Sequence, residues 1–312
     1  MKWSAALAGG KLRIICGPTG AGKSSLALML AAELNGAIVS ADSRQVYCHF
    51  DIGTAKPTRE ECARVTHYGI GVAEPEERYS AARWADEALE WIECAGELDK
   101  TAVIVGGTGL YIRALVEPLF NAPVMDPVTR SVLENELAEK PVAELRRWCE
   151  VLDPERAHLG RTQLLRSIET ALLGGARLSA LQEAHKGTSP AVEIEPAYLV
   201  VDPGDALASQ IERRVDEMFE RGWVDEVRHL MAKVPGEAPA WKASGYAAIR
   251  EHVEGNSDLS TTRQRIIIET RQYAKRQRTW FRNQLPRDAV TKLNPLDFQA
   301  AAIAREWWEK AG

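Results

Sequence analysis

Short apolar runs alternate with longer amphipathic stretches in the first part of the chain. Three of these runs, Leu12–Cys16, Ala37–Ser40 and Thr101–Val105, have the length and apolar character of buried strands. Between the first two runs, Lys23–Leu34 has apolar positions near the 3.6-residue spacing of a helix. Strands that alternate with helical stretches predict an α/β fold, in which a parallel sheet has helices on both faces.

The pattern changes after about residue 125. Residues 126–187 are rich in Leu, Glu and Arg and contain no strand pattern, so we expect an all-helical insertion domain. Ala197–Val201 then predicts a strand that returns to the core sheet. Later helices are expected at Asp205–Val234, Ser260–Asn283 and Leu296–Lys310. The predicted organisation is a first core part (1–125), a helical insertion or cap (126–190), and a part that completes the core and ends in basic helices (191–312).

Composition indicates a folded protein. Of the 312 residues, 45% are apolar and 27% are charged, which argues against long disorder. The sequence has no apolar run of about 18 residues, so we expect no membrane helix. Residues 1–10 are too weakly patterned for a signal peptide, so we expect a cytoplasmic location. The five cysteines are odd in number and include no C-x-x-C pair, so we assign them no disulfide and no metal. Nothing in the sequence suggests an oligomer, and we expect a monomer.

Positive charge is concentrated in one C-terminal segment, although the net charge of the chain is −5. Residues 263–292 contain nine Arg and Lys side chains and only two acidic ones. One face of a helix in this segment would present four cations: Arg271, Lys275, Arg278 and Arg282. Such a stripe is often a solvated face. The near absence of acidic residues within the segment favours binding to a nucleic-acid backbone instead.

Residues 17–24 have the sequence of a phosphate-binding loop, Gly-Pro-Thr-Gly-Ala-Gly-Lys-Ser, between a predicted strand and a predicted helix. Glycines in this loop allow backbone N–H groups to turn toward phosphate oxygens: Gly17, Gly20 and Gly22. Lys23 supplies a positive charge, and the hydroxyl of Ser24 is placed to ligate Mg²⁺. The sheet is therefore expected to be P-loop NTPase-like.

The motif leaves the identity of the ligand open. ATP, GTP or a diphosphate without a nucleoside would all suit a phosphate-binding loop. A Walker B strand would end in a lone Asp or Glu, whereas the third predicted strand runs into Gly106 and Gly107. The sequence therefore disfavours an ATPase.

A second polar segment follows the second predicted strand, at the edge of the sheet where the P-loop is also expected. Asp42 would act there as a general base, a Mg²⁺ ligand or an acceptor for a substrate N–H. The alternative is that Asp42 caps the following turn. Ser43 and Gln45 add hydrogen-bonding groups for a flat polar substrate. After the third strand, Thr108 offers a hydroxyl, and Arg113 offers a cation that is equally typical of a solvated helix.

Five segments together resemble the tRNA dimethylallyltransferases, the tRNA isopentenyltransferase family: Gly17–Ser24, Ala41–Tyr47, Gly53–Pro57, Gly106–Tyr111 and Thr270–Arg282. Their order and spacing match over roughly residues 12–285. The resemblance implies transfer of a dimethylallyl group from dimethylallyl diphosphate to N6 of the adenosine next to the anticodon on its 3′ side, with release of diphosphate. The P-loop would then hold a prenyl diphosphate rather than ATP, and the macromolecular partner would be the tRNA anticodon stem-loop.

The resemblance also implies roles for individual residues. Asp42 would accept the proton of the adenine amine. The departing diphosphate would be stabilised by Lys23, Arg214 and a Mg²⁺ ion on Ser24. Two hydroxyls would line the reaction channel, those of Thr19 and Thr108. Contacts to adenine and tRNA are expected from Ser43, Gln45, Lys56, Arg113, Arg271, Lys275, Arg278 and Arg282.

The chain departs from the family pattern in two segments. His67–Gly71 lacks the carboxylate that usually ends this motif, and Leu159–Gln163 differs within the helical insertion. Neither segment includes the P-loop or Asp42. The differences therefore concern the cap and the RNA contacts more than the reaction.

Three other functions suit part of the sequence. An adenylate isopentenyltransferase that acts on free nucleotides would share the core motifs, but it would need neither the basic helix nor the helical insertion. A small-molecule P-loop kinase leaves the basic helix unexplained. A non-catalytic RNA-binding NTPase module would not need Asp42. The sequence therefore favours a tRNA-modifying transferase.

Overall fold

The computed structural model describes residues 11–117, 125–185 and 195–312. The chain divides into two compact units, one formed by Met1–Glu117 with Val192–Gly312 and the other by Pro118–Ala191. The expected boundary between residues 190 and 191 lies outside the described residues. Residues 1–10, in which no signal peptide is expected, lie outside them as well. Within the described ranges, no helix is long and apolar enough to cross a membrane.

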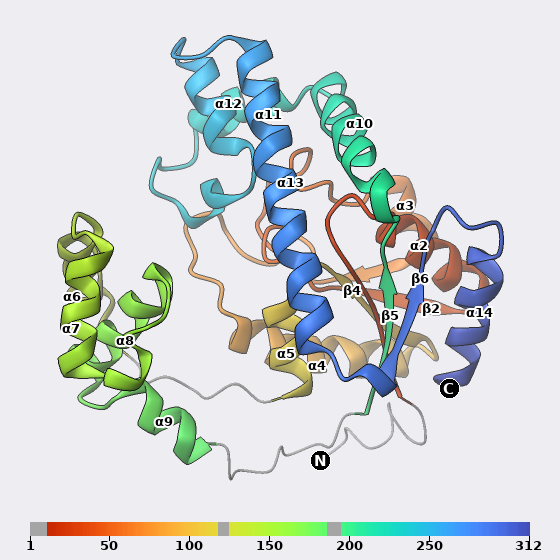
Figure 1. The fold of residues 1–312 in the computed structure, drawn as a ribbon. Helices are drawn as coiled ribbons and strands as arrows, with labels where there is room; N and C mark the ends of the chain where they lie inside the picture. Colours follow the sequence, from red (N-terminus) through yellow and green to blue (C-terminus); the bar gives the residue numbers. More distant parts are fainter. Residues whose placement is uncertain (1–10, 118–124, 186–194) are drawn as a thin grey trace. The chain divides into compact units, whose positions relative to one another are not determined.

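A six-stranded parallel sheet forms the centre of the first unit (Figure 1), with the strands in the order β3-β2-β4-β1-β5-β6. The strands are β1 Leu12–Cys16, β2 Gly36–Ser40, β3 Thr66–Tyr68, β4 Thr101–Gly106, β5 Pro196–Val201 and β6 Val290–Leu293. The sheet confirms the predicted parallel α/β fold, and β5 confirms that the chain returns to the sheet after the second unit. The short strands β3 and β6 were not predicted.

The register of the sheet brings the ends of three strands together. Cys16 at the end of β1 pairs with Gly106 of β4, and Ser40 at the end of β2 pairs with Val105 of β4. Because these strands are parallel, the loops that follow them leave the sheet at the same edge. These loops are the P-loop, the second polar segment and the glycine-rich segment after β4.

Helices cover both faces of the sheet, as predicted (Figure 1). On one face, α2 Lys23–Glu33 and α14 Ala300–Lys310 contribute Leu30, Trp307 and Trp308 to the main hydrophobic core. These large side chains are almost completely buried, and burial of apolar surface is the main contribution to the stability of such a core. The P-loop thus lies between the buried strand β1 and the helix α2, one side of which packs in the core.

On the other face, α4 Ala81–Glu97 and α5 Gly109–Val116 pack against each other and against β4. Trp84 of α4 stacks on Tyr111 of α5 with ring centroids 5.0 Å apart. The indole Nε1–H of Trp84 donates to the backbone oxygen of Ser40 at 2.9 Å. This hydrogen bond holds α4 against the end of β2, directly before the second polar segment.

One predicted helix is two helices in the structure. We expected a continuous helix over Asp205–Val234, but α10 spans Leu207–Glu220 and α11 spans Trp223–Met231. Gly222 separates them with a φ of 90°, in the left-handed region that favours glycine. The prediction was wrong because the amphipathic pattern continues across a glycine whose conformation only the tertiary structure reveals.

The C-terminal helix α14 is shorter than predicted. It begins at Ala300 rather than at Leu296, because the side chains of Asn294 and Asp297 each accept a backbone N–H two residues later, at 3.0 Å. These turns compete with a helical conformation of the same residues. Three further helices in the first unit were not predicted: α3 Arg59–Arg64, α4 Ala81–Glu97 and α12 Tyr246–Val253.

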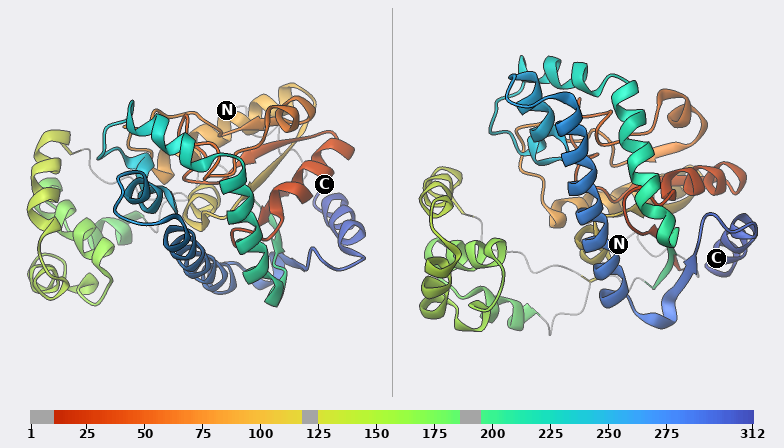
Figure 2. Two further views of the ribbon diagram at one scale, coloured as in Figure 1. Left: turned by 90° about the horizontal axis from the view of Figure 1, so that it is seen from above. Right: turned by 45° about the horizontal axis from the view of Figure 1, so that its top comes forward.

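The long basic helix α13 spans Leu259–Gln284, which extends the predicted helix by one residue at each end. The carboxylate of Asp258 caps it and accepts the N–H of Thr261 at 3.0 Å. The helix runs beside α10, as both views in Figure 2 show. Its buried side chains are Thr262, Ile266, Ile267, Ala274, Gln277 and Phe281.

The second unit is helical, as predicted. It contains α6 Pro127–Ala138, α7 Val142–Leu152, α8 Arg161–Gly174 and α9 Leu178–His185. These helices enclose a small core of their own, formed by Leu137, Leu145, Cys149, Ala157, Leu164 and Ile168. The carboxylate of Asp153 accepts the backbone N–H and the hydroxyl of Ser179, and so fixes the start of α9.

Candidate active site

Two glycines at the carboxyl edge of the sheet allow close contacts between neighbouring backbone segments. A Cβ on Gly106 would lie 2.1 Å from the backbone oxygen of Ala41, and a Cβ on Gly17 would lie 2.2 Å from the backbone oxygen of Val201. The N–H of Thr108 donates to the backbone oxygen of Ala41 at 3.1 Å. Gly106 therefore allows the second polar segment to lie against the end of β4, and Gly17 allows the P-loop to lie against the end of β5.

A cavity opens where these loops meet. Several residues proposed from the sequence line it: Thr19, Lys23, Ser24, Asp42, Gln45 and Arg214. Apolar side chains from the C-terminal helices also line it: Ile211, Val215, Met218, Trp223 and Ile266. An adjoining cavity extends along Gly20 and Gly22, and it shares Ser24 and Arg214 with the first. Cations and an apolar wall in one cavity suit a ligand that has an anionic head and an apolar tail.

Lys23 and Arg214 form a pair of cations with depressed pKa values. Burial lowers the pKa of Lys23 to about 8, and the charge of Arg214 adds to this effect, while Asp42 opposes it. Burial likewise lowers the pKa of Arg214, again against the influence of Asp42. The Lys23 ammonium donates to the backbone oxygen of Pro18 at 2.7 Å. Arg214 makes no hydrogen bond or ion pair with any described residue, so both cations are available to a bound anion.

Asp42 forms a turn and also faces the cavity. One of its carboxylate oxygens, Oδ1, accepts the N–H of Arg44 at 2.8 Å. The N–H of Ser43 donates to the hydroxyl oxygen of Thr108 at 3.0 Å, which fastens the turn to the loop after β4. The second carboxylate oxygen of Asp42 accepts no hydrogen bond from the described part of the chain. The capping role and a role in the cavity are thus compatible, because they use different oxygens.

Relatives of the chain identify its family. The IPP transferase family model matches residues 45–284. The chain is 39% identical over 295 residues to a tRNA dimethylallyltransferase of Cyanothece sp., an alignment that covers 92% of this chain and 93% of that protein. The chain belongs to the IPP transferase family. A tRNA dimethylallyltransferase of Gloeobacter violaceus is 41% identical over 282 residues, with 87% of this chain and 89% of that protein covered.

Solved structures of the family have the same fold. The full-length tRNA isopentenylpyrophosphate transferase from Bacillus halodurans superposes with a TM-score of 0.67 at 32% identity, over 97% of both chains. A eukaryotic dimethylallyltransferase acting on tRNA superposes with a TM-score of 0.76 at 24% identity, over 95% of this chain and 77% of that one. The second likeness shows a common fold.

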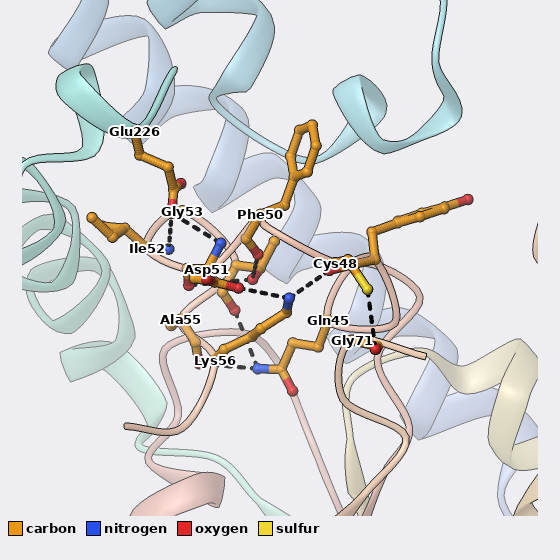
Figure 3. Close-up of polar contacts among 12 residues, drawn as sticks. Gln45, Cys48, Phe50, Asp51, Ile52, Gly53, Ala55, Lys56, Gly71 and Glu226 are labelled. Carbon is orange, nitrogen blue, oxygen red and sulfur yellow. Dashed lines mark hydrogen bonds and ion pairs between the residues drawn. The ribbon is translucent and has the colours of Figure 1, made fainter. Parts of the chain in front are cut away.

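In this member of the IPP transferase family, two residues expected to contact substrate use their polar groups within the protein (Figure 3). Gln45 donates from Nε2 to the backbone oxygens of Thr54 and Ala55, at 3.2 and 3.0 Å. Lys56 is buried, and its ammonium donates to the backbone oxygen of Tyr47 and to the carboxylate of Asp51. These contacts fold the loop between β2 and α3. The structure therefore gives both side chains an internal role, and their expected contacts with adenine or RNA stay a prediction.

Glu226 of α11 holds the same loop from the other side, a role that sequence reasoning missed. Its carboxylate accepts the N–H groups of Asp51 and Ile52, at 3.0 and 2.7 Å (Figure 3). The hydroxyl of Tyr246 donates to Glu226 at 2.6 Å and accepts the N–H of Gly53 at 3.1 Å. Burial, followed by the charge of Glu226, raises the pKa of Tyr246 well above its usual value. A Glu within a run of charged helix residues gives no local sign of such a role.

The basic face of α13 is partly neutralised by the neighbouring structure. Arg271 pairs with Glu212 of α10 at 3.1 Å, and Arg278 pairs with Asp202 after β5. These acidic partners lie on other elements, so the composition of residues 263–292 gave no sign of them. Lys275 and Arg282 are exposed and have no partner among the described residues. The free positive charge of this face is therefore smaller than the sequence suggested.

Oxygen donors at the P-loop suit a magnesium ion. The described ranges contain no group of three or more His, Cys, Asp or Glu side chains that could hold a metal. The hydroxyl of Ser24 lines both cavities, and Asp42 lines the first. Mg²⁺ in phosphate sites commonly takes one or two protein oxygens and completes its shell with substrate phosphates and water. The donor set therefore fits Mg²⁺ that is held jointly with a diphosphate.

The depressed pKa of Lys23 predicts a pH-dependent affinity for anions. Because its pKa is about 8, Lys23 is mostly charged below pH 8 and increasingly neutral above it. Binding of inorganic diphosphate, measured by calorimetry, should weaken relative to a Lys23→Arg variant by up to about tenfold per pH unit above 8. The arginine variant keeps its charge, so the titration of the ligand cancels in the ratio. Parallel pH profiles for the two proteins would contradict the assignment.

Proposed function

We propose that this protein is a tRNA dimethylallyltransferase. It transfers a dimethylallyl group from dimethylallyl diphosphate to N6 of the adenosine next to the anticodon on its 3′ side, and it releases diphosphate. The main support is the cavity that joins the cations Lys23 and Arg214, the carboxylate of Asp42 and an apolar wall. Membership of the IPP transferase family and the names of the curated relatives support the same activity.

Diphosphate is the leaving group of this reaction, and the P-loop binds it. Lys23 and Arg214 stabilise the negative charge that grows on the diphosphate as the carbon–oxygen bond breaks. Backbone N–H groups at the start of α2 provide further donors, and the helix dipole favours an anion there. A Mg²⁺ ion held by Ser24 and the diphosphate oxygens would neutralise additional charge on the leaving group.

Asp42 is the general base. The N6 lone pair forms a bond to C1 of the dimethylallyl group, and the electron pair of the C1–O bond leaves with the diphosphate. One N6 proton passes to the carboxylate oxygen of Asp42 that the turn does not use. A positioned base contributes about 10²–10⁴-fold to the rate. Thr19 lines the cavity, whereas the hydroxyl of Thr108 accepts the N–H of Ser43 and so supports the turn of Asp42.

The nucleic acid binds along α13. The adenine has to leave the stack of the anticodon loop to reach the cavity, which costs a few kcal/mol. Lys275 and Arg282 are exposed and without partners in the described chain, so they are the first candidates for phosphate contacts. Arg113 of α5 is half-buried and also lacks a described partner. A cytoplasmic monomer that acts on the anticodon stem-loop stays a prediction from the sequence.

One assay tests the proposed function against its rivals. The protein is incubated with Mg²⁺, dimethylallyl diphosphate and either tRNA or AMP, and N6-prenylated adenosine is measured by mass spectrometry. We expect product on tRNA and none on AMP. Product on AMP alone would identify an adenylate isopentenyltransferase. Phosphate transfer from ATP without any prenyl product would identify a kinase.

The Asp42→Asn variant tests the general base. The amide oxygen can still accept the N–H of Arg44, so the turn should remain, but the amide cannot take up the N6 proton. We expect the single-turnover rate to fall by about 10²–10⁴-fold, with the Kd for tRNA unchanged. Lys23→Arg serves as a charge-conserving comparison in the same cavity. A variant with the rate of the parent enzyme would exclude Asp42 as the base.

Paired substitutions on α13 test which cations contact RNA. Replacing Lys275 and Arg282 with Ala should weaken tRNA binding and lower the salt slope by about 2, that is, about 1 for each phosphate contact. Filter binding at several salt concentrations measures this slope. Arg305→Ala with Lys310→Ala removes the same charge from α14 and should leave the slope unchanged. Equal slopes for the two double variants would make α13 a solvated face.

A further inference from the structure

Gln277 joins two loops of the active site through a single buried side chain. It lies on the inward side of α13 with 7% of its surface exposed. Its Oε1 accepts the N–H of Thr19 at 2.8 Å, and its Nε2 donates to the backbone oxygen of Gly107 at 2.8 Å. A Cβ on Gly107 would lie 2.4 Å from this Nε2, so the contact requires glycine. A C-terminal helix thus links the P-loop to the loop after β4.

The peptide group between Pro18 and Thr19 is held at both of its polar ends. Its oxygen accepts the ammonium of Lys23 at 2.7 Å, and its N–H donates to Gln277. In the proposed reaction Lys23 also has to interact with the diphosphate. An anion therefore competes with the Pro18 oxygen for Lys23, whereas Gln277 is a neutral amide for which the anion does not compete in this way. Gln277 therefore keeps its hydrogen bond to the peptide N–H when the Lys23 ammonium exchanges the Pro18 oxygen for the diphosphate.

The other end of the Gln277 amide, Nε2, holds the loop that contacts the turn of Asp42, the proposed base. Gly107 immediately precedes Thr108, whose hydroxyl oxygen accepts the N–H of Ser43 next to Asp42. The distance between the diphosphate loop and the turn of Asp42 is thus set partly through one amide. A misplacement of about 1 Å in reacting groups costs a rate factor on the order of 10².

We propose that Gln277 is a positioning residue for prenyl transfer. It fixes the Pro18–Thr19 peptide relative to the loop after β4, so that the leaving group and the base keep their spacing while Lys23 binds the diphosphate. This inference rests on the proposed function. It assigns Gln277 no contact with the reacting atoms.

Two substitutions distinguish a positioning role in the reaction from a contribution to the stability of the fold alone. Gln277→Leu removes both hydrogen bonds. Gln277→Glu keeps the shape and the acceptor for Thr19, but its carboxylate faces the Gly107 oxygen without a proton to donate. Gln264 lies on the same helix, is exposed and has no partner in the described chain. Gln264→Leu and Gln264→Glu therefore serve as matched controls.

We expect Gln277→Leu to lower the single-turnover rate by about 30–100-fold, with the Kd values for tRNA and inorganic diphosphate within about threefold of the parent. The Gln277→Glu rate, divided by the parent rate, should rise at least about fivefold from pH 8.5 to pH 6. Protonation restores one donor and one acceptor to the side chain. Division by the parent rate removes the pH dependence that the two proteins share, and the charged groups that line the same cavity are common to both: Lys23, Asp42, Arg44 and Arg214.

Thermal unfolding measured beside the rates decides the outcome. A rate loss that equals the unfolded fraction, or a lowered midpoint with a normal rate, would reduce Gln277 to a structural fastener and overturn the proposal. A flat Gln277→Glu ratio across pH would overturn it as well, and this variant covers the case in which Gln277→Leu does not fold. If the parent enzyme makes no prenylated tRNA, the proposed function itself fails, and this inference fails with it. A fully active Gln277→Leu in an active background refutes the positioning role alone.

Discussion

Lys23 and Arg214 share a cavity in which burial lowers the pKa of each, and Arg214 lowers the pKa of Lys23 further. Asp42, which lines the same cavity, opposes both effects, but the described chain places no carboxylate in an ion pair with either cation. Burying charge without a partner costs free energy of folding, and removing a cation would relieve this cost. A bound diphosphate relieves it as well, and its charge increases as it departs. The electrostatic cost of burying two neighbouring cations thus becomes stabilisation of the leaving group.

The loops that form this site come early in the chain, and the groups that hold them come late. Gln277 fixes the P-loop, and Glu226 and Tyr246 fix the loop that contains Gly53. Trp223 packs so closely on Gly53 that a Cβ there would lie 2.2 Å from the indole. The second unit is inserted between these two parts of the sequence. The site is therefore complete only after the chain has returned to the sheet through β5.

Local patterns predicted much of this structure, because strands, the P-loop and an amphipathic helix depend on residues close in sequence. The prediction of Asp42 beside the P-loop rested on the same locality, since parallel strands end at one edge. Partner choice is not local. Gln45 and Lys56 are residue types that often contact substrates, yet their polar groups form hydrogen bonds within the folded loop. The sequence around Arg278 predicts a free cation, but in the structure Arg278 pairs with Asp202, which is 76 residues away in sequence. Gln277 gave no signal, because a neutral amide in a basic helix resembles any surface glutamine.

The face that α10 turns toward the cavity explains why a P-loop here suits chemistry at carbon. Ile211, Arg214, Val215 and Met218 all line this cavity, at the spacing of one side of a helix. A phosphoryl-transfer enzyme surrounds the reacting phosphorus with polar groups and metal ions. In prenyl transfer the electrophile is the carbon attached to the diphosphate. The cationic groups that bind the diphosphate therefore have to adjoin an apolar surface that binds the prenyl group. A single helix face that changes from arginine to aliphatic side chains within one turn provides that boundary. The P-loop motif defines the anionic half of the ligand, and the side chains of α10 define the half that reacts.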